Sequence, residues 1–134
     1  MALQGGCYCG KVRYEAAGTP MLRAQCHCRP CQYFSGGAAN MFMVMPVAGF
    51  SYTKGTPKKF SRRDLEDPVT REFCAECGTH LTTLRSDLPA AILKIGTLDD
   101  PGLFAPKIAI FTIDKQPFHQ IPEGMPTFER MPNR

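Results

Sequence analysis

The chain has 134 residues, of which 43% are hydrophobic and 21% charged, so a wholly disordered protein is excluded and one domain spanning residues 1–134 is expected. The formal net charge is +4, and no apolar run approaches the roughly 20 residues of a membrane helix, so we expect no membrane partner. No secretory signal is visible at the N-terminus, and we therefore expect a cytoplasmic protein.

Alternation of apolar and polar residues dominates the chain and predicts β-strands. In residues 11–16, Val12, Tyr14 and Ala16 fall on one face and charged residues on the other. Further strands are expected at residues 39–45, 50–54, 58–61, 70–74, 80–84, 90–95 and 107–113, between turn signals rich in Gly, Pro and Asp. The predicted class is mainly β, built of short strands without parallel βαβ units.

Helical signals are limited to residues 29–35, where Pro30 suits a first helical turn and Gly36 a stop. The last segment, residues 116–134, is rich in proline. We expect it to be extended and laid over the domain rather than to form a second one.

Two further features have ordinary structural interpretations. Met41, Met43 and Met45 alternate along one strand, which favours core packing over a soft-metal site. The basic residues Lys54, Lys58, Lys59, Arg62 and Arg63 are interpreted first as a solvated strand face, with a landing site for substrate carboxylates as the less favoured alternative.

The seven cysteines fall into three groups: Cys7 and Cys9, then Cys26, Cys28 and Cys31, then Cys74 and Cys77. An odd number leaves one thiol over in a complete disulfide framework, and cysteine clusters in a reducing compartment are more often metal-binding or catalytic. Side chains two positions apart on a strand point to the same side, so the two cysteines of a Cys-x-Cys pair would share one side. In the Cys-x-x-Cys-Gly segment, Gly78 can supply the positive φ of a metal knuckle.

Zinc prefers four tetrahedral ligands, and closed sites are usually structural, whereas three protein ligands with an open position are typical of catalytic zinc. The two pairs therefore predict a structural zinc site of Cys7, Cys9, Cys74 and Cys77, hereafter the quartet. The remaining residues, Cys26, Cys28 and Cys31, predict a second zinc site with an open position, hereafter the trio.

Two alternatives remain for the trio. A histidine could complete it as a second structural site: His27 should point away from its cysteine neighbours on a strand, but His80 or His119 could reach across. Alternatively, Cys28 and Cys31 could form a redox dithiol, although such motifs usually open a helix in a βαβ unit. Zinc bound by four and by three thiolates would bring the net charge from +4 to about +1, which weakens any argument for a nucleic-acid partner.

The cysteine motifs resemble those of the glutathione-dependent formaldehyde-activating enzymes, which share a domain with centromere protein V. The resemblance rests on the segments GGCYCGKVRYE (5–15), CHCRPCQ (26–32), REFCAECGT (71–79) and GTLDDP (96–101). It implies an all-β, tent-like domain of short antiparallel strands stiffened by zinc, with the quartet structural and the trio as the site where a thiol acts. This family often has a tryptophan where this chain has Phe118, an aromatic that could line the pocket.

The resemblance implies a carbon–sulfur lyase that adds a thiol such as glutathione to formaldehyde or a related small aldehyde. Cys26, Cys28 and Cys31 would be the catalytic group, with zinc as cofactor and a small thiol as substrate partner. The alternative is a non-catalytic zinc-binding module with the same fold that binds another protein.

Overall fold

The computed structural model describes residues 2–132. Its strands are β1 (Ala2–Gly6), β2 (Arg13–Ala17), β3 (Leu22–Cys26), β4 (Asn40–Pro46), β5 (Phe50–Lys54), β6 (Lys58–Phe60), β7 (Thr70–Phe73), β8 (His80–Leu84), β9 (Ala90–Lys94) and β10 (Ile108–Ile110). One α-helix, α1 (Arg29–Phe34), and short 3₁₀ turns at Val47–Gly49, Ile95–Thr97, Pro101–Leu103 and Thr112–Asp114 complete the regular structure of these residues. The mainly β class is confirmed.

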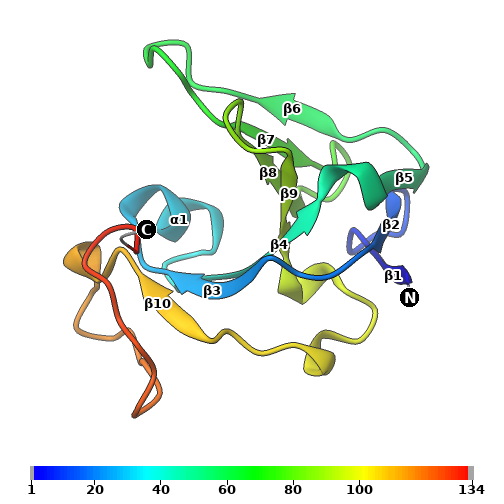
Figure 1. The fold of residues 1–134 in the computed structure, drawn as a ribbon. Helices are drawn as coiled ribbons and strands as arrows, with labels where there is room; N and C mark the ends of the chain where they lie inside the picture. The colour runs from blue at the N-terminus through cyan, green and yellow to red at the C-terminus, as the bar shows by residue number, and fades with distance from the viewer. Residues whose placement is uncertain (1, 133–134) are drawn as a thin grey trace.

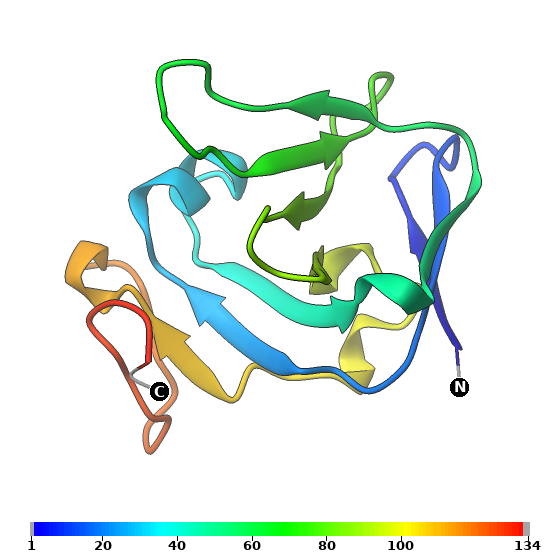
Figure 2. The ribbon, with the colours of Figure 1, turned by 45° about the horizontal axis from the view of Figure 1, so that its top comes forward.

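The strands form two sheets (Figure 1). A three-stranded sheet has the order β1-β2-β5, and a seven-stranded sheet has the order β10-β3-β4-β9-β8-β7-β6. The longer sheet curls, so that helix α1, which follows β3, comes to face β7 and β8 (Figure 2). Strand β1 and the C-terminal segment lie at opposite ends of the molecule in both views.

Strand β4 is buried on both of its faces, which explains its continuous apolar sequence. Met43 and Met45 point into a core between the two sheets, where they join Tyr14, Leu81 and Leu93. Their neighbours on β4 face a second core instead, which also holds Ala24 of β3, Ile110 of β10 and Cys31 of α1. The quartet contributes Cys7 and Cys74 to the first core, and the trio contributes Cys26 and Cys31 to the second.

Most predicted strands are found within one or two residues of their expected ends. Residues 50–54 and 80–84 match β5 and β8, and the helix predicted at 29–35 is α1 with Pro30 in its first turn. The predicted inward face of β2 is confirmed, because Val12, Tyr14 and Ala16 are at most 3% exposed.

Three expectations are wrong in part. The strand expected at 107–113 is only β10, because Phe111 takes a left-handed conformation (φ 54°) that ends the strand before a 3₁₀ turn. The strands are not all antiparallel, since β10 pairs parallel with β3. Met41 is not a core residue: it is 41% exposed, while Met43 and Met45 are fully buried.

The segment after residue 115 runs beside strand β10. Thr127 forms a parallel bridge with Ala109, and the Phe128 N–H donates to the carbonyl of Ala109 at 2.9 Å. Residues 133 and 134 of the predicted tail lie outside the described residues. No helix in the described part of the chain is long and apolar enough to cross a bilayer.

Candidate metal centres

The quartet is assembled from two loops that are distant in sequence. Cys7 and Cys9 follow strand β1, and Cys74 and Cys77 follow strand β7. All four sulfur atoms lie within 4.8 Å of one another, with Cys7–Cys9 at 3.6 Å and Cys9–Cys74 at 3.7 Å. A tetrahedral zinc site with bonds of about 2.3 Å has sulfurs about 3.8 Å apart, so these four residues fit zinc.

Hydrogen bonds that donate to the sulfur atoms of Cys7, Cys74 and Cys77 stabilise negative charge on them. The Val12 N–H donates to Cys7 at 3.2 Å, and the Glu76 N–H donates to Cys74 at 3.4 Å. A hydrogen bond from the Thr79 hydroxyl lowers the pKa of Cys77 to about 5. Gly78 has the predicted positive φ of 77°, and its N–H closes the knuckle on the Cys74 carbonyl at 2.8 Å.

The trio forms where strand β3 passes into helix α1. Cys26 ends β3, Cys28 caps the helix and Cys31 lies in its first turn, with all three sulfur atoms within 4.8 Å. The Cys31 N–H donates to the Cys28 sulfur at 3.4 Å, and the Asn40 side-chain amide donates to the Cys31 sulfur at 3.7 Å. Hydrogen bonds from Cys26 and Cys28 lower the pKa of Cys31, and hydrogen bonds with Cys28 and Cys31 raise the pKa of Cys26. The trio therefore has the donors and the spacing that suit a metal cation.

Within residues 2–132, no histidine or carboxylate belongs to the trio's group of mutually close ligand atoms. His27 points away from its cysteine neighbours, as predicted, and is fully buried. Its Nδ1 lies 3.1 Å from Nδ1 of His119, whose Nε2 lies 2.6 Å from the carbonyl oxygen of Gly37. These two histidines are therefore engaged with each other and not with the trio.

A cavity of about 220 Å³ opens beside Cys31, between helix α1 and the strands that it faces. Its polar lining comes from Ser35 after α1, Asn40 of β4, Arg71 of β7, His80 of β8 and Lys94 of β9. The Arg71 guanidinium lies 4.2 Å from the ring centroid of Phe34, the helix residue at the cavity mouth. The site is thus one in which sulfur ligands and two cationic side chains share a small space.

Burial governs the electrostatics of this cavity. It lowers the pKa of Lys94 to about 8, and the nearby Arg71 acts in the same direction. Burial also lowers the pKa of His80 to about 3, with further contributions from Lys94 and Arg71. His80 is therefore neutral at physiological pH, and the cations of the cavity are Arg71 and Lys94.

A second cavity of about 390 Å³ adjoins the first, because Ala39 and Met41 line both. Phe118 lines this second cavity, not the one at Cys31, and is 67% exposed. The basic residues of the 54–63 segment are all exposed, as expected for a solvated face. They take no part in the lining of either cavity.

Sequence reasoning missed the contribution of Arg71 and Lys94 to the site. Both lie in segments predicted as strands, and a lone lysine in the apolar run 90–95 was the available signal. A charged residue at an otherwise buried strand position requires a local reason, because its burial is costly. The pairing of β7, β8 and β9, which brings these residues together, is not visible in the sequence.

Comparison with known proteins adds two findings. The family model described as "Glutathione-dependent formaldehyde-activating enzyme" matches residues 2–114. A crystal structure of a Rhodobacter sphaeroides protein has a similar fold, with a TM-score of 0.59 and 19% sequence identity, over 72% of this chain and 88% of that chain. At this identity the likeness concerns the fold alone.

Proposed function

This chain belongs to the family of glutathione-dependent formaldehyde-activating enzymes, and we propose that it adds a small thiol such as glutathione to formaldehyde or a related small aldehyde. The product would be an S-hydroxymethyl thiol, which makes the protein a carbon–sulfur lyase in the direction of adduct breakdown. The observation that carries this proposal is the trio, a group of three sulfur ligands that lies beside a cavity lined by two cations.

The two cysteine groups have different roles in this proposal. The quartet is a closed four-sulfur site that holds a structural zinc, whereas the trio holds a second zinc with room for one more ligand. When bound at the trio, zinc supplies a site at which a thiol is stable as the nucleophilic thiolate.

The cavity residues match the charge of an incoming thiolate. Three thiolates and one zinc ion leave one net negative charge, which one of the two cations balances. The remaining cation favours the entry of one further anion. Arg71 and Lys94 together therefore make the cavity suitable for a thiolate, and both belong to strands of the seven-stranded sheet, β7 and β9.

A zinc count tests the arrangement. Native mass spectrometry should show two zinc ions per chain, and the Cys31→Ser variant should retain one. Adduct formation from glutathione and formaldehyde should be accelerated by the wild-type protein and not by Cys31→Ser. Equal rates with a folded, singly metallated Cys31→Ser protein would contradict the proposal. Two zinc ions with no acceleration by the wild type would favour a non-catalytic zinc-binding module instead.

A further inference from the structure

One side-chain atom beside the trio is buried without a hydrogen-bond partner in the described chain: Nδ1 of His80. The other ring nitrogen, Nε2, lies 3.2 Å from the carbonyl oxygen of Thr82. Because a carbonyl only accepts hydrogen bonds, Nε2 carries the ring proton, and Nδ1 presents a bare lone pair. Leaving such an acceptor buried and unpaired costs about 1–3 kcal/mol, so a ligand that donates to it would gain affinity.

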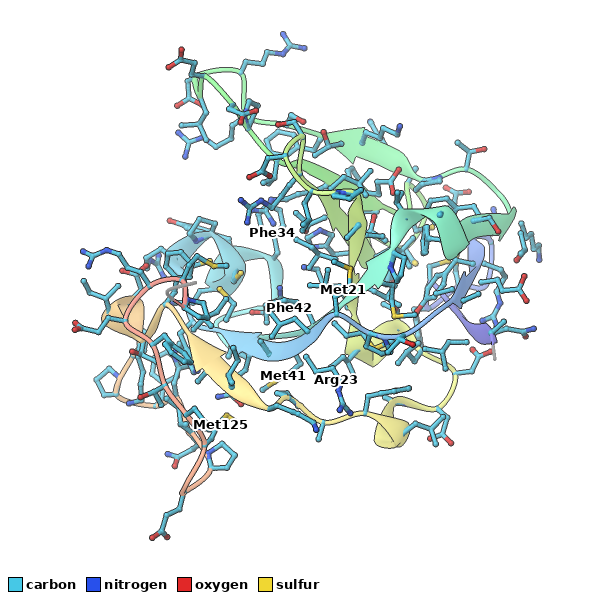
Figure 3. The ribbon with its side chains drawn as sticks, viewed as in Figure 1. Met21, Arg23, Phe34, Met41, Phe42 and Met125 are labelled. Atoms are coloured by element: carbon cyan, nitrogen blue, oxygen red, sulfur yellow. The ribbon has the colours of Figure 1, made fainter. Side chains whose placement is uncertain are left out.

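The ring of His80 is held in place at the wall of the cavity. It packs against Phe34 with ring centroids 5.1 Å apart, and the Arg71 guanidinium lies over the same Phe34 ring. Figure 3 shows Phe34 in the space between helix α1 and strands β7 and β8. His80 and Cys31 line the same cavity, so a molecule that reaches the trio also comes near the His80 ring.

Lys94 offers the complementary group. Its ammonium donates to the Thr83 hydroxyl at 3.3 Å and has three N–H donors in all, which leaves donors for a ligand in the cavity. The residues that line the cavity therefore include one with free donors, Lys94, and one with a free acceptor, His80. A hydroxyl group, which both accepts and donates a hydrogen bond, matches this pair, whereas a bare carbonyl oxygen matches only Lys94.

We propose that His80 and Lys94 bind the oxygen atom of the aldehyde, Lys94 as the donor during addition and His80 Nδ1 as the acceptor of the resulting hydroxyl. This inference rests on the proposed function. In the step, the sulfur electron pair of the thiolate forms the new bond to the carbonyl carbon, and the carbonyl π pair moves to oxygen. The proton released by the thiol ends on that oxygen, so nothing is oxidised or reduced.

The two residues act at different points of this step. Lys94 hydrogen-bonds the oxygen while negative charge develops on it, which is where a fixed donor lowers a barrier most. His80 accepts a hydrogen bond from the hydroxyl as the proton reaches the oxygen, so it stabilises the late part of the step and the adduct, and not the free aldehyde. His80 is thus expected to affect adduct formation and breakdown, and not the binding of the thiol alone.

Two variants of the zinc-loaded protein test the role of His80. His80→Phe keeps a ring against Phe34 and removes Nδ1, and we expect a kcat for adduct formation roughly tenfold lower, the loss that one hydrogen bond represents. In His80→Asn the side-chain oxygen can take the place of Nδ1, and we expect most of the rate to return. Both variants should hold two zinc ions and bind glutathione alone, measured by calorimetry, as the wild type does.

Nuclear magnetic resonance of ¹⁵N-histidine-labelled protein gives a readout that is independent of rate. The Nδ1 resonance of His80 should move when glutathione and formaldehyde are added together, and not with glutathione alone. Loss of one zinc from both His80 variants would instead make His80 a metal ligand and overturn the inference. Unchanged kcat in His80→Phe would overturn it while leaving the proposed function intact, whereas absence of acceleration by the wild type would refute both.

Discussion

Cys9 and Cys74 are separated by 65 positions in the sequence, yet their sulfur atoms lie 3.7 Å apart. The contact joins the loop after β1 to the loop after β7. It therefore links the three-stranded sheet to strand β7, next to the β6 edge of the seven-stranded sheet. Around it, Lys11 and Glu76 form a salt bridge between the same two loops at 2.7 Å, although both side chains are exposed. This salt bridge therefore contributes little to the connection, since exposed ion pairs are weak.

The first prediction concerns this connection. Cys74→Ser should remove one zinc ion and lower the free energy of unfolding by at least about 4 kcal/mol, because structural zinc contributes folding free energy directly. Cys28→Ser, the matched change in the trio, should also remove one zinc ion but cost less stability. The checks are zinc content and thermal unfolding of both variants. Comparable stability losses in the two would contradict a structural quartet and an accessory trio.

The Cys-x-x-Cys-Gly knuckle and most strands could be predicted from the sequence, because their signals lie in residues that are close together in the chain. The Gly78 knuckle and the alternation of Val12, Tyr14 and Ala16 depend on residues close in the chain, and both are found as predicted. Strand β1 was not predicted, because Gly5 weakens its strand pattern. A Cβ at Gly5 would lie 2.3 Å from the Thr97 carbonyl oxygen, so glycine is required there by close packing.

The cavity could not be predicted because it depends on strand pairing at long range. Arg71 pairs with Thr83, and Lys94 pairs with Phe42, so the order of strands in the curled sheet decides that both face Cys31. Strand β3 was obscured by Gln25, a polar residue that is nevertheless 2% exposed. Its burial is explained by hydrogen bonds to His27 and to the carbonyl of Gln120, which no local pattern indicates.

The second prediction concerns Arg71. Replacing Arg71 by Gln removes a cation from the cavity at the trio and should weaken the binding of glutathione roughly tenfold, since a nearby positive charge favours the thiolate. The difference from wild type should shrink as ionic strength rises. Calorimetry with zinc-loaded protein at low and high salt measures both effects. Arg63→Gln, an exposed site away from the cavity, is the control, and an equal effect there would refute a specific role for Arg71.

The third prediction concerns the attachment of the C-terminal segment through His119. Its Nδ1 accepts the Gln116 N–H at 3.0 Å and faces His27, and its Nε2 faces the Gly37 carbonyl. His119→Ala leaves these groups unpaired, among them the buried His27, and should lower the free energy of unfolding by about 1–3 kcal/mol. Hydrogen exchange should increase over residues 116–120.

Phe118→Ala is the matched control for His119→Ala, because Phe118 is the neighbouring aromatic residue but is 67% exposed. It should change the free energy of unfolding by much less. Urea unfolding of the two variants gives the comparison. If both variants unfold at the same urea concentration as the wild type, the histidine pair does not hold the segment in place.

The fourth prediction concerns stability at alkaline pH and rests on Tyr14. Its side chain is 1% exposed, its hydroxyl pairs with Thr97 at 2.8 Å, and burial raises its pKa to about 12. In the unfolded chain this tyrosine ionises near pH 10. The neutral phenol therefore stabilises the fold fully below about pH 10, and this contribution, at most about 3 kcal/mol, is lost as pH rises toward 12. Tyr14→Phe should therefore flatten the fall in stability over this range, at a cost of about 1 kcal/mol at neutral pH for the lost hydrogen bond.

Burial raises the pKa of Tyr52 as well, so part of the slope should remain in Tyr14→Phe. Tyr33→Phe, at a residue 76% exposed, should leave the profile unchanged, and an identical alkaline profile in Tyr14→Phe and wild type would show that Tyr14 ionisation does not contribute.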